Sequence, residues 1–292
     1  MIILYGIEEN YKDVTLYAKE LGNCIIIPCG DNNRCDLFGG DPLPNVLKHI
    51  KINDIIYNHF KTLIVNFDTD SVTLVPDPLL EKIDRLSKIH STSVLKYGSF
   101  IEEYPEQLMA SQYIKPTDKV LELGGNIGRN SIVIAKLLSD SSHLVTLECD
   151  STIASQLTEN RDLNQLSFHI ENSAISLRKL CQRGWDTYPY DGDLPHNSKS
   201  VNTITFDELQ QKYSITFDTL VADCEGALFY ILQDFPTLLT HIQTIIMEND
   251  YHELSHKLKV DEIITSNGFK RLYSEAGGWG PCYDYFFEVW KK

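Results

Sequence analysis

The sequence is short of basic residues. Its 26 Lys and Arg residues are outnumbered by 41 Asp and Glu residues, which gives the 292-residue chain a formal net charge of −15. A protein that binds the phosphate backbone of a nucleic acid needs a basic surface that displaces counterions. We therefore expect neither nucleic acid nor a membrane surface among the partners of this protein.

Long apolar runs and cysteine motifs are also missing. No stretch approaches the ~18 consecutive apolar residues of a transmembrane helix, and the first residues lack the basic and apolar regions of a signal peptide. The seven cysteines are odd in number, and no two of them are spaced as CxxC. This usage favours reduced thiols and a cytoplasmic location. A disulfide or a metal site among Cys24, Cys29 and Cys35 is the alternative.

Residues 1–90 are predicted to form a small β-rich module. Five short β-rich runs (IILYGI, NCIIIPC, HIKINDIIY, TLIVNF and SVTLVP) are separated by turn clusters such as GDNNR and GGDPLP. One helix is expected near Tyr11–Leu21. We recognise no set of catalytic residues in this module. Its candidate roles are glycan binding, dimerisation and shaping of an acceptor cleft. From about residue 86 to residue 114 the pattern becomes helical.

Residues 91–292 are predicted to form an α/β domain. Strand-length apolar runs alternate there with helical stretches, which is typical of a doubly wound, mostly parallel sheet. The last two of seven strands follow each other without a helix, so we expect the final strand to be antiparallel. The polar stretch Gly184–Ser200 interrupts the alternation and is interpreted as a surface insertion. The seven predicted strands are Lys119–Leu123, His143–Leu147, Ser167–Ile170, Phe217–Ala222, His241–Met247, Phe269–Tyr273 and Tyr283–Trp290.

A glycine-rich turn joins the first of these strands to a helix, in the segment VLELGGNIGRNS. A dinucleotide-binding GxGxxG motif that begins at Gly124 would need glycine where Asn126 and Arg129 stand, and no Gly-Lys-Ser/Thr follows for a phosphate-binding loop. About 20 residues further along, the second strand ends at Glu148, where an acidic residue accepts hydrogen bonds from a ribose diol. A nucleoside site without a glycine platform for pyrophosphate points to S-adenosylmethionine. Its methionine part would meet the turn, and its ribose would meet Glu148.

Several motifs, in order along residues 94–290, resemble those of class I S-adenosylmethionine-dependent methyltransferases of the FkbM type. An acidic residue followed by a Gly-Asn-x-Gly turn matches the first motif of the family, and Glu148 matches its Glu-Pro motif with Cys149 in place of the proline. The later Asp-x-Glu-Gly motif matches Asp223, Glu225 and Gly226. The resemblance implies the same α/β fold, and implies that the cofactor-binding residues are Glu122, Gly124, Gly125, Asn126, Gly128, Glu148, Cys149, Ser173 and Ala174.

The catalytic groups are expected beyond the carboxyl ends of the parallel strands, where ligands bind in open α/β sheets. Methyl transfer is an in-line displacement, so the enzyme aligns the nucleophile and removes its proton. Asp223, Glu225 and His252 are the candidate bases. Helix capping by Glu225 and a solvated position for His252 are the structural alternatives.

A divalent cation is a further option at the same strand ends. Asp223 and Glu248, with Asn249 or Asp250, would offer the oxygen ligands that suit Mg²⁺ or Ca²⁺. The alternative is that these residues position the cofactor and the acceptor without a metal. His252 also begins an HExxH pattern, but the charged residues around it and its place after the fifth strand argue against a zinc hydrolase.

The resemblance implies O-methylation of a hydroxyl on a sugar, a nucleotide sugar or a glycoside. The expected partner is therefore a small-molecule or glycan acceptor, and a homodimer is a further expectation. A non-catalytic glycan- or partner-binding protein that retains the methyltransferase fold is the alternative. Flat aromatic side chains suit a sugar face. The aromatic residues expected near the edge of the pocket are Trp185, Tyr188, Tyr190, Trp279, Tyr283 and Tyr285.

Overall fold

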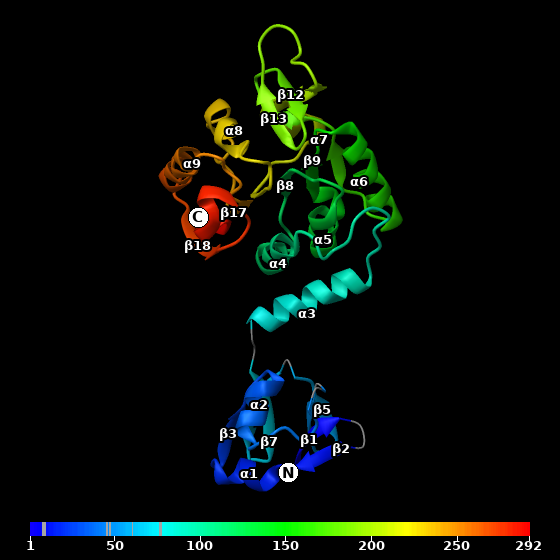
Figure 1. Cartoon of the computed structure of the whole chain (residues 1–292), viewed down its shortest axis with the longest axis vertical. Coiled ribbons are helices and arrows are strands. Elements are labelled where there is room, and N and C mark those ends of the chain that lie inside the picture. Colours follow the sequence, from blue (N-terminus) through cyan, green and yellow to red (C-terminus); the bar gives the residue numbers. More distant parts are fainter. Residues whose placement is uncertain (8–9, 45, 47, 60, 76–77) are drawn as a thin grey trace. The chain divides into compact units, whose positions relative to one another are not determined.

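The structure is a computed structural model that describes residues 1–7, 10–44, 46, 48–59, 61–75 and 78–292. The chain divides into two compact units, Met1–Asp84 and Arg85–Lys292 (Figure 1). The sequence placed this division between residues 90 and 91. The helix α3 (Pro78–Ser91) runs through both positions, which explains why a change of composition does not mark the boundary.

The described residues of the first unit form two antiparallel sheets, two short helices and the start of α3. One sheet has the order β2-β1-β4-β5 and the other has the order β3-β6-β7. The five β-rich runs of the sequence contain all of these strands except β2. The predicted helix at Tyr11–Leu21 is shorter than expected because residues 10–13 pair with β1 instead. The elements are β1 (Ile3–Ile7), β2 (Asn10–Asp13), α1 (Thr15–Glu20), β3 (Cys24–Ile27), α2 (Asp31–Leu37), β4 (His49–Ile52), β5 (Ile55–Tyr57), β6 (Thr62–Asn66) and β7 (Ser71–Val75).

All seven cysteines are free thiols. In the described ranges, Asp31, Cys35 and Asp41 form the one group of three potential metal ligands whose atoms lie within 4.8 Å of one another. The fully buried Lys48 places its Nζ 2.8 Å from Asp31 and 2.7 Å from Asp41. The Lys48 ammonium balances the charge of the two carboxylates, so this cluster of side chains already contains a cation. The alternative of a disulfide or metal site among Cys24, Cys29 and Cys35 is therefore not supported by the geometry of Cys35.

The second unit is built on a seven-stranded sheet of order β10-β9-β8-β16-β17-β19-β18. The pairings β10–β9, β9–β8, β8–β16 and β16–β17 are parallel, whereas β19 is antiparallel to both of its neighbours. The predicted doubly wound, mostly parallel sheet with an antiparallel last strand is thus confirmed. The strands are β8 (Val120–Leu123), β9 (Leu144–Leu147), β10 (His169–Glu171), β16 (Thr219–Ala222), β17 (Thr244–Glu248), β18 (Lys270–Glu275) and β19 (Phe287–Lys291).

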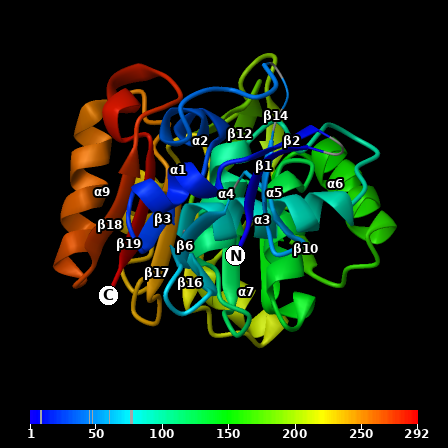
Figure 2. The same ribbon diagram turned by 90° about the horizontal axis from the view of Figure 1, so that it is seen from below.

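Helices cover this sheet, with α6 toward the β10 end (Figure 2) and α9 toward the β18 end (Figures 1 and 2). The strands β8, β9 and β16 are buried at every position, as expected for central strands of a sheet covered on both faces. Among the described residues, no helix is both long and apolar enough to cross a bilayer. The helices are α4 (Tyr104–Tyr113), α5 (Arg129–Leu137), α6 (Ser151–Leu163), α7 (Phe206–Tyr213), α8 (Leu228–Asp234) and α9 (Leu254–Ser266), with short 3₁₀ turns η1 (Ser141–His143) and η2 (Gly280–Tyr285).

The predicted surface insertion Gly184–Ser200 belongs to a small antiparallel sheet. The strands β12 (Leu180–Arg183), β13 (Asp186–Pro189) and β14 (Lys199–Val201) form it. Arg183 pairs with Asp186, so Gly184 and Trp185 are the two residues of a tight hairpin turn, and Gly184 has a φ of +67°. The insertion is therefore ordered, and its hairpin forms part of the site described below. A parallel pair, β11 (Ala174–Ile175) and β15 (Thr203–Ile204), connects it to the rest of the unit.

Candidate functional site

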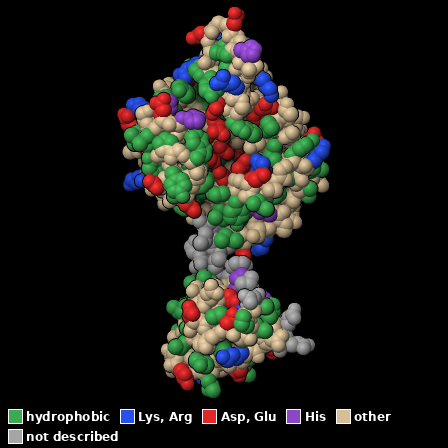
Figure 3. Space-filling model, in the orientation of Figure 1, with side chains coloured by type: hydrophobic (Ala, Val, Ile, Leu, Met, Phe, Trp, Pro, Cys, Tyr) green, Lys and Arg blue, Asp and Glu red, His purple; other side chains and the backbone are tan. Residues whose placement is uncertain are grey.

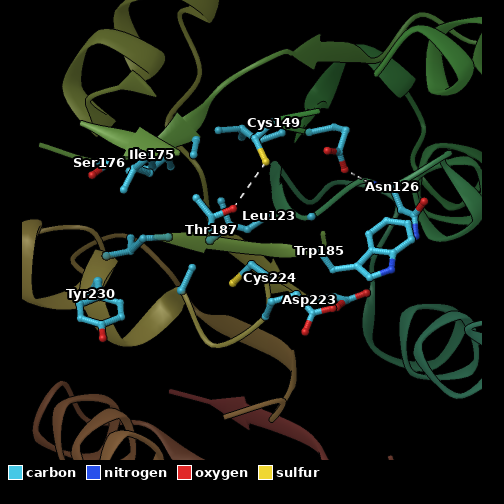
Figure 4. Close-up of a pocket in the computed structure, with 18 of the residues that line it drawn as sticks. Leu123, Asn126, Cys149, Ile175, Ser176, Trp185, Thr187, Asp223, Cys224 and Tyr230 are labelled. Atoms are coloured by element: carbon cyan, nitrogen blue, oxygen red, sulfur yellow. Dashed lines mark hydrogen bonds between the residues drawn. The ribbon is translucent and has the colours of Figure 1, made fainter. Parts of the chain in front are cut away.

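A cavity of about 520 Å³ lies beyond the carboxyl ends of β8, β9, β16 and β17. Leu123 and Leu147 end β8 and β9, Asp223 follows β16, and Glu248 ends β17, and all four line the cavity. The side chains of Asn126, Cys149, Asp223 and Tyr230 surround it (Figure 4). This is the position at which open α/β sheets bind their ligands.

The glycines of the turn after β8 are required by close packing. Gly124 has a φ of +87°, and a Cβ atom on it would lie 1.5 Å from the backbone oxygen of Asp223. A Cβ on Gly125 would lie 2.3 Å from Thr146 Oγ1, and one on Gly128 would lie 2.3 Å from a methyl group of Leu157. Gly124 lines the cavity, whereas Gly125 and Gly128 do not. These last two were predicted to bind the cofactor, and the structure gives them the role of shaping the turn.

Glu148 connects the end of β9 to the glycine turn. Its Oε2 accepts a hydrogen bond from the Asn126 backbone N–H at 2.9 Å, and its Oε1 accepts one from the Asp150 N–H at 2.8 Å. Burial raises the pKa of this carboxyl, and the two N–H donors act in the opposite direction. Because Glu148 and Asn126 both line the cavity, a ligand there meets a carboxylate that is already oriented.

Glu122 lies beneath the turn instead of in the cavity. It is 2% exposed, and the Ser131 hydroxyl donates a hydrogen bond to its Oε2. Burial raises the pKa of Glu122 to about 7. Since Glu122 does not line the cavity, its predicted contact with the cofactor is not supported. Its carboxyl joins β8 to the first turn of α5.

Cys149, Ser173 and Ala174 line the cavity, as the prediction for cofactor-binding residues requires. Burial raises the pKa of the Cys149 thiol to about 11, so the group is a neutral thiol near pH 7. Its Sγ lies 3.8 Å from the Thr187 hydroxyl of the β12–β13 hairpin (Figure 4). The end of β9, the segment after β10 and the hairpin thus enclose one end of the cavity.

Two of the three predicted catalytic residues, Asp223 and Glu225, line the cavity. Burial and the nearby carboxyl of Asp250 raise the pKa of Asp223 well above its usual range. Burial also raises the pKa of Glu225, which occupies a left-handed backbone conformation with a φ of +50°. These raised values fit groups that accept a proton from a substrate.

The third predicted base, His252, does not line the cavity. Its Nε2 lies 3.5 Å from Asp186 Oδ1 of the hairpin, and its ring packs on Trp279 at a centroid distance of 4.9 Å. The helix α9 begins at Leu254, so the HExxH pattern does not place both histidines on one helix. His256 stacks on Phe229 instead, at 3.8 Å between the ring centroids.

The predicted metal ligands are only partly brought together. Asp223 and Glu248 line the cavity, whereas Asn249 is fully buried and donates a hydrogen bond from Nδ2 to the Tyr285 backbone oxygen at 2.7 Å. No group of three His, Cys, Asp or Glu ligand atoms within 4.8 Å occurs in the described part of this unit. The cavity therefore brings together Asp223 and Glu248 but not Asn249, and a metal site at these residues is not supported.

The sequence analysis missed two acidic residues that line the cavity. Glu103 and Glu106 flank Pro105 at the start of α4 and line the cavity. Arg129 forms an ion pair with Glu103 at 2.7 Å. A proline at a helix start between two acidic residues was the available signal, but it indicates only a helix N-terminus. Of the six aromatic residues expected at the edge, Trp185 lines the cavity and the other five do not.

The cavity is strongly acidic. Figure 3 shows carboxylates gathered in a hollow of the larger unit, and the one basic side chain among the described lining residues, Arg178, is paired with Asp234 at 2.5 Å. This charge favours a cationic ligand. The seven lining carboxylates belong to Glu103, Glu106, Glu148, Asp223, Glu225, Asp234 and Glu248.

No family model and no curated protein sequence matches the chain. Among solved structures, a ribosomal protein L11 methylase from Lactobacillus delbrueckii subsp. bulgaricus is 13% identical, with coverage of 68% of this chain and 81% of that chain and a TM-score of 0.44. An O-methyltransferase from Bacillus cereus in complex with SAH is 17% identical, with coverage of 75% and 93% and a TM-score of 0.41. A tRNA methyltransferase from M. jannaschii is 11% identical, with coverage of 67% and 50% and a TM-score of 0.40. The proposals below rest on the residues of this chain.

Proposed function

We propose that this protein is an S-adenosylmethionine-dependent O-methyltransferase that acts on a hydroxyl of a sugar, a nucleotide sugar or a glycoside. The observation that carries the proposal is the oriented carboxylate of Glu148, which lines the cavity directly beside the glycine turn. An acidic residue at the end of the second strand binds a ribose diol, and the turn lacks the spacing for a pyrophosphate.

The lining residues fit the chemistry of this cofactor. Glu148 would hold the ribose, Gly124 and Asn126 would contact the methionine part, and Cys149 with Ser173 would border the adenine. The acidic wall attracts a cationic sulfonium. When bound, S-adenosylmethionine supplies a methyl group whose bond to sulfur breaks as the bond to the acceptor oxygen forms, leaving a neutral thioether.

The protein's own contribution is to orient the hydroxyl and to accept its proton. Asp223 is the first candidate base, and Glu225 is the second. Burial makes Asp223 a stronger proton acceptor than an exposed carboxylate, once it has lost its own proton. This raised pKa favours an enzyme over the alternative of a binding protein that only retains the fold.

Calorimetry with the full chain and S-adenosylmethionine tests the cofactor. We expect binding with one site per chain, and absence of binding would rule out the proposal. Incubation with a panel of sugars, nucleotide sugars and glycosides should then give a methyl-sized mass gain on an acceptor oxygen. Binding without any transfer would favour the non-catalytic alternative, and transfer to a protein or an RNA would overturn the substrate class.

A further inference from the structure

Five of the seven lining carboxyl groups form no ion pair in the described residues, and three of the five lie close to α4, β16 and β17. These three belong to Glu106, Asp223 and Glu248, none of which forms an ion pair with a Lys, Arg or His side chain that the structure describes. Of the other four acids, Glu103 pairs with Arg129 and Asp234 pairs with Arg178. Glu148 accepts two backbone N–H groups, and Glu225 has no ion pair in the described residues. The unbalanced charge is therefore concentrated where α4 faces the ends of β16 and β17.

Glu106 is the residue that points to a ligand. It is only 7% exposed, it lines the cavity, and its Oε2 has no hydrogen-bond partner. A buried carboxylate oxygen without a donor costs about 1–3 kcal/mol or more, so such atoms usually have a partner in the functional state. Because Glu106 lines the cavity, a ligand there that donates hydrogen bonds is the candidate partner of its carboxyl group.

The cofactor alone does not balance this wall. S-adenosylmethionine carries a sulfonium, an ammonium and a carboxylate, so its net charge is +1. Three ionised carboxylates opposite it would leave an excess negative charge in a partly dry cavity. Burial, followed by a hydrogen bond with Glu106, raises the pKa of Glu248 to about 11, so this carboxyl holds a proton near pH 7 before a ligand is bound.

We propose that the acceptor carries an ammonium group close to the hydroxyl that is methylated, and that Glu106 and Glu248 bind this group. The inference rests on the proposed function and narrows its acceptor to an amino sugar or a similar amino alcohol. An ammonium supplies several N–H donors and one positive charge, which are what Glu106 Oε2 and its neighbours lack.

Two further observations favour an ammonium over a metal ion. The three carboxylates do not bring three ligand atoms within 4.8 Å of one another, whereas a divalent cation needs a compact oxygen shell. Trp185 also lines the cavity, and the face of an indole attracts an organic cation (Figure 4). A carboxylate wall together with an aromatic face is suited to a substituted ammonium.

The bound ammonium also affects the reaction. A positive charge beside Glu248 and Asp223 lowers the pKa of both carboxyl groups, so Asp223 is ionised when the acceptor is in place. It can then take the proton of the hydroxyl as the new oxygen–carbon bond forms. An acceptor that lacks the ammonium leaves the pKa of both carboxyl groups raised, so a smaller fraction of Asp223 is ionised and able to act as a base.

Calorimetry on the full chain saturated with S-adenosylhomocysteine provides the test. The probes are glucosamine, below the pKa of its amine, and N-acetylglucosamine, which keeps the nitrogen but removes the charge. We expect glucosamine to bind about 10–100-fold more tightly, as a charge-assisted hydrogen bond predicts. Glu106→Gln should abolish this preference, whereas the control Glu159→Gln, which removes an exposed carboxylate of α6 outside the cavity, should preserve it.

The outcomes separate this inference from the proposed function. Glucosamine that binds no more tightly than N-acetylglucosamine, including no binding of either, overturns the inference while binding of S-adenosylhomocysteine still supports the cofactor site. Loss of S-adenosylhomocysteine affinity in Glu106→Gln would assign Glu106 to the cofactor and overturn the inference as well. Binding of Mg²⁺ alone that depends on Glu106 would replace the ammonium with a metal. Circular dichroism of each variant checks that it is folded.

Discussion

The backbone N–H of Asn126 donates a hydrogen bond to Glu148 Oε2 across 2.9 Å, which fixes the glycine turn to the end of β9. The second oxygen of the same carboxylate accepts the Asp150 N–H at 2.8 Å. Both oxygens are therefore oriented before a ligand binds. A ribose diol would therefore bind a carboxylate that is already held in place. This lowers the conformational entropy that the side chain loses on binding.

Glu148→Gln should weaken S-adenosylmethionine binding about 10–100-fold, measured by calorimetry. The amide has one acceptor oxygen, so its NH₂ group must face one of the two backbone N–H donors, and the charge on the ribose contact is lost. Glu159→Gln on the exposed face of α6 is the matched control and should bind normally. An unchanged affinity in Glu148→Gln would remove Glu148 from the site.

Gly124→Ala should destabilise the protein by about 2–5 kcal/mol and abolish cofactor binding. The added Cβ would lie 1.5 Å from the Asp223 backbone oxygen, and the φ of +87° is strained for alanine. Gly192→Ala is the control, because Gly192 has a similar φ of +78° but no atom within 4 Å of the added Cβ. It should cost only about 1–2 kcal/mol in a urea titration. Equal losses in the two variants would contradict the packing role of Gly124.

Glu122→Gln should change how stability depends on pH. Folding raises the pKa of Glu122 from 4.5 to about 7, so the folded state holds a proton that the unfolded state has lost between these values. The free energy of unfolding therefore falls as the pH rises through this window, by up to about 3 kcal/mol from this group. The amide cannot ionise, and it can still accept the Ser131 hydrogen bond.

Denaturant titrations between pH 5 and about 8 measure this effect. The variant should match the wild type at the acidic end and exceed it at the alkaline end. A pH profile identical to that of the wild type would show that the Glu122 pKa is not raised on folding.

Much of the sheet could be predicted from the sequence because its strands are short apolar runs that are bounded by turns or helical stretches. Glu148 was found for the same reason, since its place depends only on the strand before it. Glu106 could not be found in this way, because α4 precedes the sheet in the chain and reaches the cavity through tertiary packing against α5 and β17. Local sequence also could not show that Asn249 is fully buried against the Tyr285 backbone and does not line the cavity.

The Gly184–Ser200 segment illustrates a different limit. Its polar composition indicates exposure, and Trp185 is indeed 65% exposed. Composition does not reveal strand pairing, however, and the pairing of β12 with β13 is what carries Trp185 to the cavity. Six aromatic residues were predicted near the pocket because they lie in or near loops. Only Trp185, in the hairpin turn, lines the cavity.

Trp185→Ala should weaken S-adenosylmethionine binding about 2–30-fold, which corresponds to a cation–π contact of about 0.5–2 kcal/mol. Trp185 is one of three tryptophans, and it is the one that lines the cavity. Wild-type fluorescence should therefore change on cofactor binding. Trp279→Ala, which removes an exposed tryptophan packed on His252, should retain the change, and Trp185→Ala should lose it. A signal that survives in Trp185→Ala and disappears in Trp279→Ala would contradict this placement.

Asp223→Asn should lower kcat about 10²–10⁴-fold, as expected for loss of a general base, whereas His252→Ala should leave kcat nearly unchanged. Asp223 lines the cavity and His252 instead contacts Asp186 of the hairpin. Because burial raises the pKa of Asp223 in the ligand-free protein, a larger fraction of the base is ionised toward higher pH, so kcat/KM of the wild type should rise with pH. Methyl transfer followed by mass spectrometry across a pH series measures both effects. A large loss in His252→Ala together with a small one in Asp223→Asn would exchange the two roles and would require the hairpin to move aside during turnover.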